Sequence, residues 1–278
     1  MPELPDIFVL ARSMDQALCG RSITGVKIYQ PKCLNLPEEE FCRAVIGHAF
    51  HRARHRGKWV IADLNRDWTL AFNLGMGGEV RLHGATEIPN PQRERVVLYL
   101  DNGQQLWTHF WWFGHVHLIP LGELNVHPLL ARLGPEPLVA DFTPQKLEEM
   151  LRGKRGAIKK YLLDQSFIAG IGNVYIQDIL WYARLHPLRT VNTLDQADIE
   201  RLHNAIQYVL SEGIRWGGGP REYDVWGNEG HYAEHLQVGY QTGKPCPACG
   251  TVIEELRVGS TTSYICPCCQ KLGKEKNE

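Results

Sequence analysis

The sequence has no apolar run long enough to cross a membrane, and its opening residues, MPELPD, show neither the basic nor the apolar segment of a secretion signal. These absences argue against a membrane-spanning or secreted protein, so we expect a cytoplasmic one. No charge of one sign predominates, because 30 lysines and arginines balance 31 acidic residues and the net charge is −1. A general attraction to polyanions is therefore excluded, and any such partner must meet local basic patches.

Apolar residues are numerous enough for a sizeable core, since 44% of the 278 residues are hydrophobic and 22% are charged. This composition excludes a disordered chain, and the length favours two domains over one. The eight cysteines argue against a disulfide framework, because cytosolic thiols stay reduced. Five of the cysteines lie within the last 33 residues, which indicates a metal site.

Three regions of different pattern follow one another along the chain. Apolar spacing over residues 6–19 predicts a helix that ends at Gly20. Short β-rich runs over residues 22–121 predict a β-sandwich or a barrel-like domain. Prolines and glycines between residues 120 and 137 indicate a linker.

The pattern after the linker is helical. Thr143 before Pro144 is typical of a helix cap, and Thr193 with Gln196 suggests a capping box. Apolar residues then recur at helical spacing from about residue 195 until the glycines that begin at Gly217.

Four cysteines near the end of the sequence have the spacing of a zinc site. Cys246 with Cys249 and Cys266 with Cys269 form two pairs, separated by a segment that predicts a β-hairpin. Four free or redox-active cysteines are the alternative. A closed site of four thiolates has no open coordination position, so we expect one structural zinc ion, with Cys268 as a bystander.

Two basic stretches could line an anion-binding groove. Residues 41–62 contain arginines, histidines and Lys58 but no carboxylate, and residues 152–160 contain five lysines and arginines just before the turn Gly170-Ile-Gly-Asn173. Each stretch alone is more typical of a solvated face, and only their combination favours nucleic acid. The backbone N–H groups of the glycine turn could point at a phosphate.

Together, these features resemble the formamidopyrimidine-DNA glycosylase/endonuclease VIII family of bifunctional base-excision enzymes. Five blocks match in order: MPELP at 1–5, RGKW at 56–59, LGMG at 74–77, DQ and AGIGN between 164 and 173, and the cysteine hairpin.

The resemblance implies an α+β fold with an N-terminal β-sandwich and a leading helix, a helical helix-two-turn-helix domain and a C-terminal four-cysteine zinc-ribbon β-hairpin. We expect a catalytic domain over residues 1–125, a linker over 126–140, a DNA-binding domain over 141–232 and a zinc-finger hairpin over 233–278.

The beginning of the chain suggests a nucleophile. Removal of Met1 would give Pro2 a free secondary amine, and an N-terminal amine with a pKa of about 8 is partly neutral at physiological pH. Such an amine could attack C1′ of a damaged nucleotide, and Glu3 could pass protons to the sugar oxygen. An exposed, inactive terminus is the ordinary alternative. The resemblance favours Pro2 as the nucleophile, with Glu3 and Lys58 in the catalytic group.

The resemblance also implies a set of DNA contacts. Lys58 would approach the lesion and its phosphates, Lys159 and Asn173 would contact phosphate, and Met76 would fill the hole left by an everted nucleotide. Met76 could instead be core filling. The expected DNA-binding residues are Lys159, Asn173, Met76, Trp112, Phe113 and Arg56.

Several positions depart from the family pattern. Asp6 stands where the family commonly has glutamate, Asn73 where it has histidine, and Thr261 where it has an arginine. The loop that usually reads RRFG is Trp111-Trp-Phe-Gly114 here. Trp112 could stack in the gap left by the everted base, whereas Trp111 could equally pack in the sandwich core. We expect the glycine-rich segment 217–232 to be the flexible loop that covers that base in relatives.

The sequence therefore predicts a DNA glycosylase with abasic-site lyase activity that acts on damaged DNA, either duplex or single-stranded. The protein would hold one Zn²⁺, act as a monomer, bind no membrane and associate with a bacterial nucleoid. One alternative is a damage-binding protein of the same fold with little or no turnover, because cationic contacts are missing. A second is a zinc-ribbon adaptor for RNA or protein.

Overall fold

The computed structural model describes residues 1–65 and 67–273, and the chain forms two compact units. The first unit contains Met1–Arg132 and Trp216–His231, and the second contains Leu133–Arg215 and the chain from Tyr232 onward. Residues 216–231 thus pack with the N-terminal unit, although they follow the helices of the second unit in sequence. The last five residues of the expected zinc-finger segment, 274–278, lie outside the described residues.

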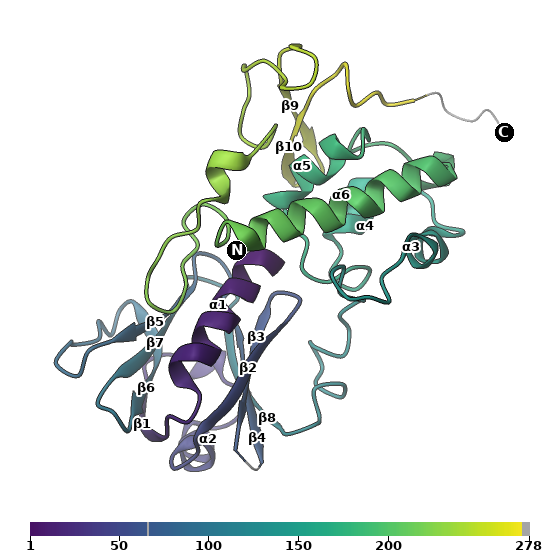
Figure 1. Ribbon diagram of the computed structural model, residues 1–278. Helices are drawn as coiled ribbons and strands as arrows, with labels where there is room; N and C mark the ends of the chain where they lie inside the picture. The colour runs from purple at the N-terminus through teal and green to yellow at the C-terminus, as the bar shows by residue number, and fades with distance from the viewer. Residues whose placement is uncertain (66, 274–278) are drawn as a thin grey trace. The chain divides into compact units, whose positions relative to one another are not determined.

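The first unit is a β-sandwich with a leading helix, as predicted (Figure 1). Helix α1 spans Leu4–Leu18, and a short helix α2 spans Glu38–Val45. One sheet has the strand order β1-β6-β7-β5 and the other β2-β3-β4-β8, and all neighbours are antiparallel. The strands are β1 (Ile23–Ile28), β2 (Phe50–Arg56), β3 (Trp59–Leu64), β4 (Trp68–Asn73), β5 (Glu79–His83), β6 (Glu94–Leu100), β7 (Gln105–His109) and β8 (His115–Pro120).

Helix α1 seals the core of this unit along one apolar stripe. Ile7, Leu10, Met14 and Leu18 are spaced three or four residues apart and are almost fully buried. They pack in one cluster with side chains of both sheets, such as Phe72 of β4. The helix thereby anchors Pro2 and Glu3, which directly precede it, to the sandwich.

The second unit is helical and ends in a β-hairpin, again as expected. Its helices are α3 (Pro144–Leu151), α4 (Ile158–Leu163), α5 (Tyr175–Tyr182) and α6 (Gln196–Arg215), and its strands are β9 (Glu254–Val258) and β10 (Thr261–Ile265). Thr143 caps α3, since its hydroxyl accepts the N–H of Lys146 at 3.1 Å. Short 3₁₀ turns occupy Pro31–Cys33 in the first unit and Val191–Thr193 and Tyr232–His235 in the second.

The predicted capping box at Thr193 is wrong. The N–H of Asp198 donates to the Asp195 carboxylate at 2.8 Å, and the N–H of Asp195 donates to the Asp198 carboxylate at 3.3 Å, which is a reciprocal cap two residues further on. Thr193 instead lies in a 3₁₀ turn and donates its hydroxyl to the carbonyl of Thr190. The two aspartates take the cap because their carboxylates accept backbone N–H groups more strongly than a hydroxyl does.

No helix of the described part of the chain is both long and apolar enough to cross a membrane.

Candidate active site and metal centre

The N-terminal turn of α1 is buried and rich in carboxylates. Pro2 is buried and Glu3 is only 2% exposed. The backbone N–H of Glu3 donates to one oxygen of Asp6 at 2.7 Å, and the N–H of Gly219 donates to the other oxygen at 2.8 Å. Asp6 therefore ties the start of the chain to the segment 216–231.

Lys58 lies in the two-residue turn that joins β2 to β3, directly after Gly57, whose φ of 56° suits the tight reversal. The side chain is partly buried, and burial lowers the pKa of its ammonium, while the charges of Glu3 and Asp6 act in the opposite direction. The structure thus brings Lys58, Glu3 and Asp6 into one electrostatic group. The lowered pKa gives Lys58 a larger neutral fraction than an exposed lysine has.

Glu222 joins this group, and the sequence analysis did not identify it. Burial raises the pKa of its carboxyl to about 9, the nearby Asp6 adds to the rise, and the N-terminal amine opposes it. This rise in pKa favours the neutral form of Glu222, which can donate a hydrogen bond. The only sequence signal was its place in the glycine-rich segment, because nothing local marks a glutamate that meets Asp6 in space.

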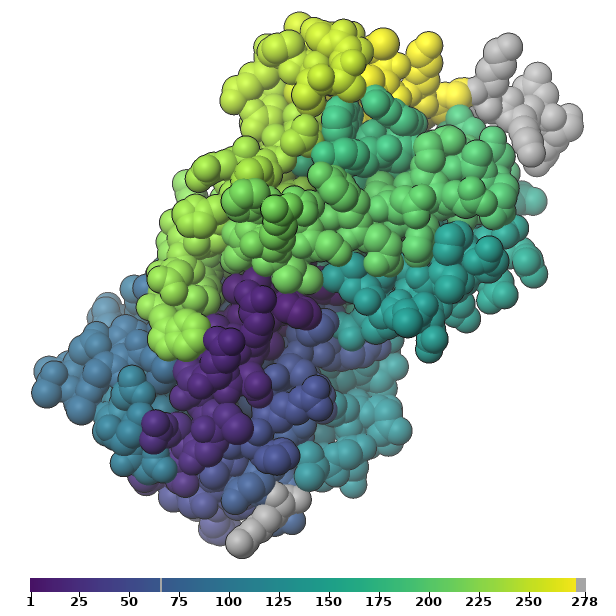
Figure 2. Space-filling view, viewed as in Figure 1, coloured from purple at the N-terminus to yellow at the C-terminus, as the bar shows by residue number. Residues whose placement is uncertain are grey.

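Segment 216–231 is fixed to the sandwich by backbone hydrogen bonds. The N–H of His231 donates to Trp216 O at 2.8 Å and closes the base of the segment. The N–H of Val225 donates to the Ser13 hydroxyl of α1 at 3.0 Å, and the N–H of Leu82 donates to Val225 O at 2.8 Å. Figure 2 shows this yellow-green segment beside the purple N-terminal helix. Its expected role over an everted base stays a prediction.

Two loops of the sandwich pair through their backbones and expose large apolar side chains. The N–H of Met76 donates to Trp112 O at 3.0 Å, and the N–H of Trp111 donates to Met76 O at 3.1 Å. Trp111 is 54% exposed and Trp112 is 62% exposed, so the interpretation of Trp111 as a core residue is wrong. Its ring lies outside because the hydrogen bonds to Met76 hold the loop at the edge of the sandwich.

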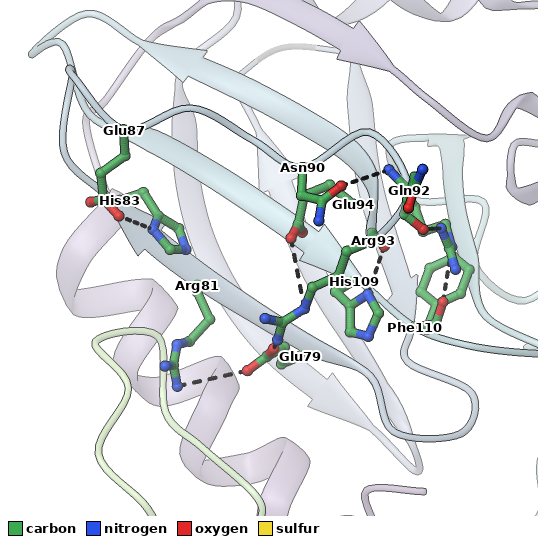
Figure 3. A network of polar contacts seen from close by, with 11 residues as sticks. Glu79, Arg81, His83, Glu87, Asn90, Gln92, Arg93, Glu94, His109 and Phe110 are labelled. Atoms are coloured by element: carbon green, nitrogen blue, oxygen red, sulfur yellow. Dashed lines mark hydrogen bonds and ion pairs between the residues drawn. The ribbon is translucent and has the colours of Figure 1, made fainter.

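A polar network connects strands β5, β6 and β7 of the first sheet (Figure 3). His109 on β7 faces Glu94 on β6 and Glu79 on β5. A ring nitrogen of His109 lies 2.6 Å from Arg93 O, and Arg93 also forms an ion pair with Glu79. Burial raises the pKa of Glu94 to about 6 and lowers that of His109.

In the second unit, the side chain of Lys159 is buried rather than exposed to solvent. It is 1% exposed, and its ammonium donates to Thr262 O at 2.9 Å and to the Ser263 hydroxyl at 2.7 Å. Burial lowers its pKa to about 8. Two of the three ammonium protons of Lys159 thus donate to the terminal hairpin, and one proton remains for the expected hydrogen bond to phosphate.

Asn173 lies just before α5 and is held by Gln177. The Gln177 amide donates to Asn173 O at 2.8 Å, to the Asn173 side-chain oxygen at 3.1 Å and to Thr262 O at 3.2 Å. The side-chain oxygen of Gln177 accepts the N–H of Tyr264 at 3.0 Å. Asn173 and Lys159 therefore share one polar network with strand β10, and this link was not visible in the sequence.

The four predicted cysteines form a metal-binding cluster. The sulfur atoms of Cys246, Cys249, Cys266 and Cys269 all lie within 4.8 Å of one another. Three pairs are 3.4, 3.5 and 3.9 Å apart, which agrees with the spacing of about 3.8 Å expected around a tetrahedral zinc with Zn–S bonds of about 2.3 Å. The donor set fits one structural Zn²⁺, and Cys268 lies outside it. The ion would crosslink the turns on either side of the hairpin.

The described chain combines a β-sandwich, a helical unit and a hairpin whose four cysteines fit a structural zinc site. Three family models match it. The formamidopyrimidine-DNA glycosylase N-terminal domain matches residues 1–110, the H2TH domain of the same enzyme matches residues 133–223, and the zinc finger found in FPG and IleRS matches residues 243–272.

Whole-chain relatives agree with these models. The chain is 42% identical over 258 residues to a formamidopyrimidine-DNA glycosylase of Chloroflexus aurantiacus, which covers 91% of this chain and 92% of that protein. It is 36% identical over 263 residues to the enzyme of that name from Protochlamydia amoebophila, with coverage of 91% and 94%.

Solved structures give the same result. A Lactococcus lactis FPG variant with Fapy-dG containing DNA superposes with a TM-score of 0.91 at 30% identity, covering 97% of this chain and 100% of the other. L. lactis Fpg with abasic-site DNA gives 0.90 at 29% identity, covering 97% and 99%. The chain belongs to the formamidopyrimidine-DNA glycosylase family.

Proposed function

We propose that this protein excises damaged bases from DNA and cleaves the strand at the resulting abasic site, with Pro2 as the nucleophile. Relatives named formamidopyrimidine-DNA glycosylase, and neighbours solved with damaged or abasic DNA, support DNA as the substrate. The observation that carries the proposal is the buried start of the chain: Pro2 and Glu3 are buried, and the N–H of Glu3 donates to Asp6. The charges of Glu3 and Asp6 also act on the Lys58 ammonium.

The first step is displacement of the base. After removal of Met1, the neutral amine of Pro2 attacks C1′, and the glycosidic bond breaks with its electron pair leaving on the base, which takes up a proton. Glu3 donates a proton to the sugar ring oxygen as the ring opens, so that an iminium ion forms between Pro2 and C1′. The amine loses its own proton in the same sequence.

The lyase step uses that iminium as an electron sink. Loss of a proton from C2′ and departure of the 3′ phosphate break the C3′–O bond, and water then releases Pro2. Lys58 places a positive charge beside this chemistry, where a phosphate of the strand would be stabilised. Lys159 and Asn173 would hold further phosphates.

Borohydride trapping on abasic-site DNA tests the proposal. The wild-type chain should form a covalent adduct, a chain lacking Pro2 should form none, and Glu3→Gln should slow its formation by about 10²-fold or more. Lys32→Ala removes an exposed lysine and serves as the matched control for Lys58→Ala. An undiminished adduct without Pro2 would contradict the proposal. DNA binding with no adduct from the intact chain would favour the damage-binding alternative.

A further inference from the structure

Four exposed apolar side chains gather on the paired loops 74–78 and 110–114 of the first unit. We propose that this aromatic platform, made of Met76, Trp111, Trp112 and Phe113, stacks against unpaired bases beside the damage, and that the enzyme therefore does not select the base opposite its lesion. The inference rests on the proposed function, because it assigns a substrate class to that same site.

Exposure on this scale is uncommon for side chains of this size. Met76 is 48% exposed, Trp112 is 62% exposed and Phe113 is 76% exposed. Apolar groups that face water together mark a surface that binds a partner. The three faces offer a large contact area for planar ligands, and each aromatic ring has a π face for stacking.

The platform is preorganised by tight backbone packing. Gly75 and Gly77 have φ values of 51° and 61°, and a Cβ at Gly75 would lie 2.0 Å from Trp112 O. A Cβ at Gly77 would lie 2.8 Å from the Trp111 ring. Only glycine allows the two loops to approach this closely, so the aromatic side chains are presented on a fixed frame.

The network in Figure 3 includes His109 and Phe110, which directly precede the platform residues or contact them. The His109 ring meets the Trp111 ring edge-on, with centroids 4.8 Å apart. The guanidinium of Arg95 donates to Phe110 O at 2.8 Å, directly before the two tryptophans. Arg95 thus bonds the start of the loop at Phe110, and Arg93 O contacts His109 just before it. The exposed aromatic rings of the loop are those of residues 111–113.

Asn73 connects the platform to the proposed catalytic group. Its amide donates to Lys58 O at 3.1 Å, and its side-chain oxygen accepts the N–H of Gly75 at 3.2 Å. One side chain therefore spans from the Lys58 turn to the loop of Met76. A DNA strand held at the Lys58 turn, as the proposed function requires, would therefore bring the bases next to the damaged nucleotide to the platform.

The side chains of the platform recognise faces rather than edges. Segments 74–78 (LGMGG) and 110–114 (FWWFG) contain no charged side chain, and their only side-chain donors are the two indole N–H groups. Discrimination among bases requires donors and acceptors aligned with base edges, whereas stacking tolerates every base. The structure thus favours DNA in which the opposite base is unpaired, missing or of any identity.

Cleavage of a matched set of oligonucleotides tests this specificity. One abasic lesion is placed opposite each of the four bases, opposite a one-nucleotide gap, in a bubble and in a single strand. Wild-type kcat/KM should vary by no more than about threefold across the set, since stacking reads no base identity. A preference above about tenfold for one opposite base would overturn the inference even though cleavage itself succeeds.

Variants of Trp112 separate stacking from folding. Trp112→Ala should lower kcat/KM about tenfold or more on every substrate, whereas Trp112→Phe should retain most of it because a ring remains. Ile88→Ala, at a side chain that is 88% exposed in the β5–β6 loop, is the control and should change nothing. An unaffected Trp112→Ala enzyme would rule out the platform.

A binding measurement keeps the inference independent of turnover. DNA with a reduced, uncleavable abasic site should quench tryptophan fluorescence in the wild type, and Trp112→Phe should remove part of that quenching. Quenching without any cleavage would support the platform while the proposed catalysis fails. Equal binding of undamaged single-stranded RNA, or no quenching by DNA, would overturn the platform as a DNA site.

Discussion

The Asp6 carboxylate accepts the backbone N–H of Gly219 at 2.8 Å, across 213 positions of sequence. Its other oxygen accepts the N–H of Glu3 at 2.7 Å. A Cβ at Gly218 would lie 3.1 Å from the same carboxylate, so a glycine there gives the side chain room. One short acid therefore sets the position of the N-terminal turn relative to the segment that contains Glu222.

Asp6→Ala should destabilise the first unit by about 1–3 kcal/mol, because two backbone N–H groups lose a charged acceptor. Asp6→Asn keeps one oxygen acceptor and should lose less. Hydrogen exchange at Gly219 checks the cause: the amide should exchange faster in Asp6→Ala, while amides of β3 and β4 keep their relative protection. Unchanged exchange at Gly219 would contradict the assigned hydrogen bond.

Glu222 should make stability pH-dependent. Its folded pKa of about 9 lies above its ordinary value of 4.5, so the folded state holds an extra proton between these values. Stability from this group is full below pH 4.5 and is lost as the pH rises toward 9, by at most about 1.4 kcal/mol per pH unit.

Glu222→Gln should remove this dependence, and the variant should be more stable than the wild type at pH 8 but not at pH 4. Denaturant unfolding at a series of pH values measures the difference. Glu123→Gln alters an exposed carboxylate of the same unit and should leave the pH profile unchanged. A constant difference between wild type and Glu222→Gln at all pH values would show that Glu222 is ionised in the folded protein.

Gln177 should couple the zinc hairpin to Asn173. Gln177→Leu keeps the size but leaves Thr262 O and the Tyr264 N–H without this partner, which should cost about 1–3 kcal/mol of stability. DNA affinity should fall, while the trapping rate at saturating DNA stays close to that of the wild type. Gln196→Leu, at an exposed position of α6, is the control. A slower saturated rate with normal affinity would contradict a positioning role.

Zinc removal should unfold the terminal hairpin and weaken DNA binding while the sandwich stays folded. The four cysteine sulfurs lie within 4.8 Å of one another, and a segment this short has little apolar core without its metal. Hydrogen exchange after chelation should show loss of protection in β9 and β10 but not in β3. Cys249→Ser should mimic chelation, and Cys268→Ser should not. Unchanged binding after verified zinc loss would refute the link.

Local patterns in the sequence predicted much of the fold. Apolar spacing gave α1, the two cysteine pairs gave the metal centre, and Thr143 gave the cap of α3. Such features depend on residues close in sequence, so periodicity and spacing reveal them. The reciprocal cap of Asp195 and Asp198 was missed because Thr193 and Gln196, two residues earlier, show the same local capping pattern.

Features that depend on distant contacts were not predictable. The pKa of Glu222 is set by burial and by Asp6, and the enclosure of Lys159 is set by strand β10. Trp111 has a large apolar side chain of the kind found in cores, yet the hydrogen bonds between its loop and Met76 hold it on the surface of the sandwich. Each outcome follows from tertiary packing, which no window of neighbouring residues encodes.

The most direct test of the account is the site of attachment in the borohydride-trapped complex with abasic-site DNA. Proteolysis and mass spectrometry of the adduct should find Met1 removed and the deoxyribose remnant on the nitrogen of Pro2, with Lys58 unmodified. An adduct attached to Lys58 or to another lysine, or a chain that retains Met1 and still forms the adduct, would contradict the assignment of Pro2 as the nucleophile.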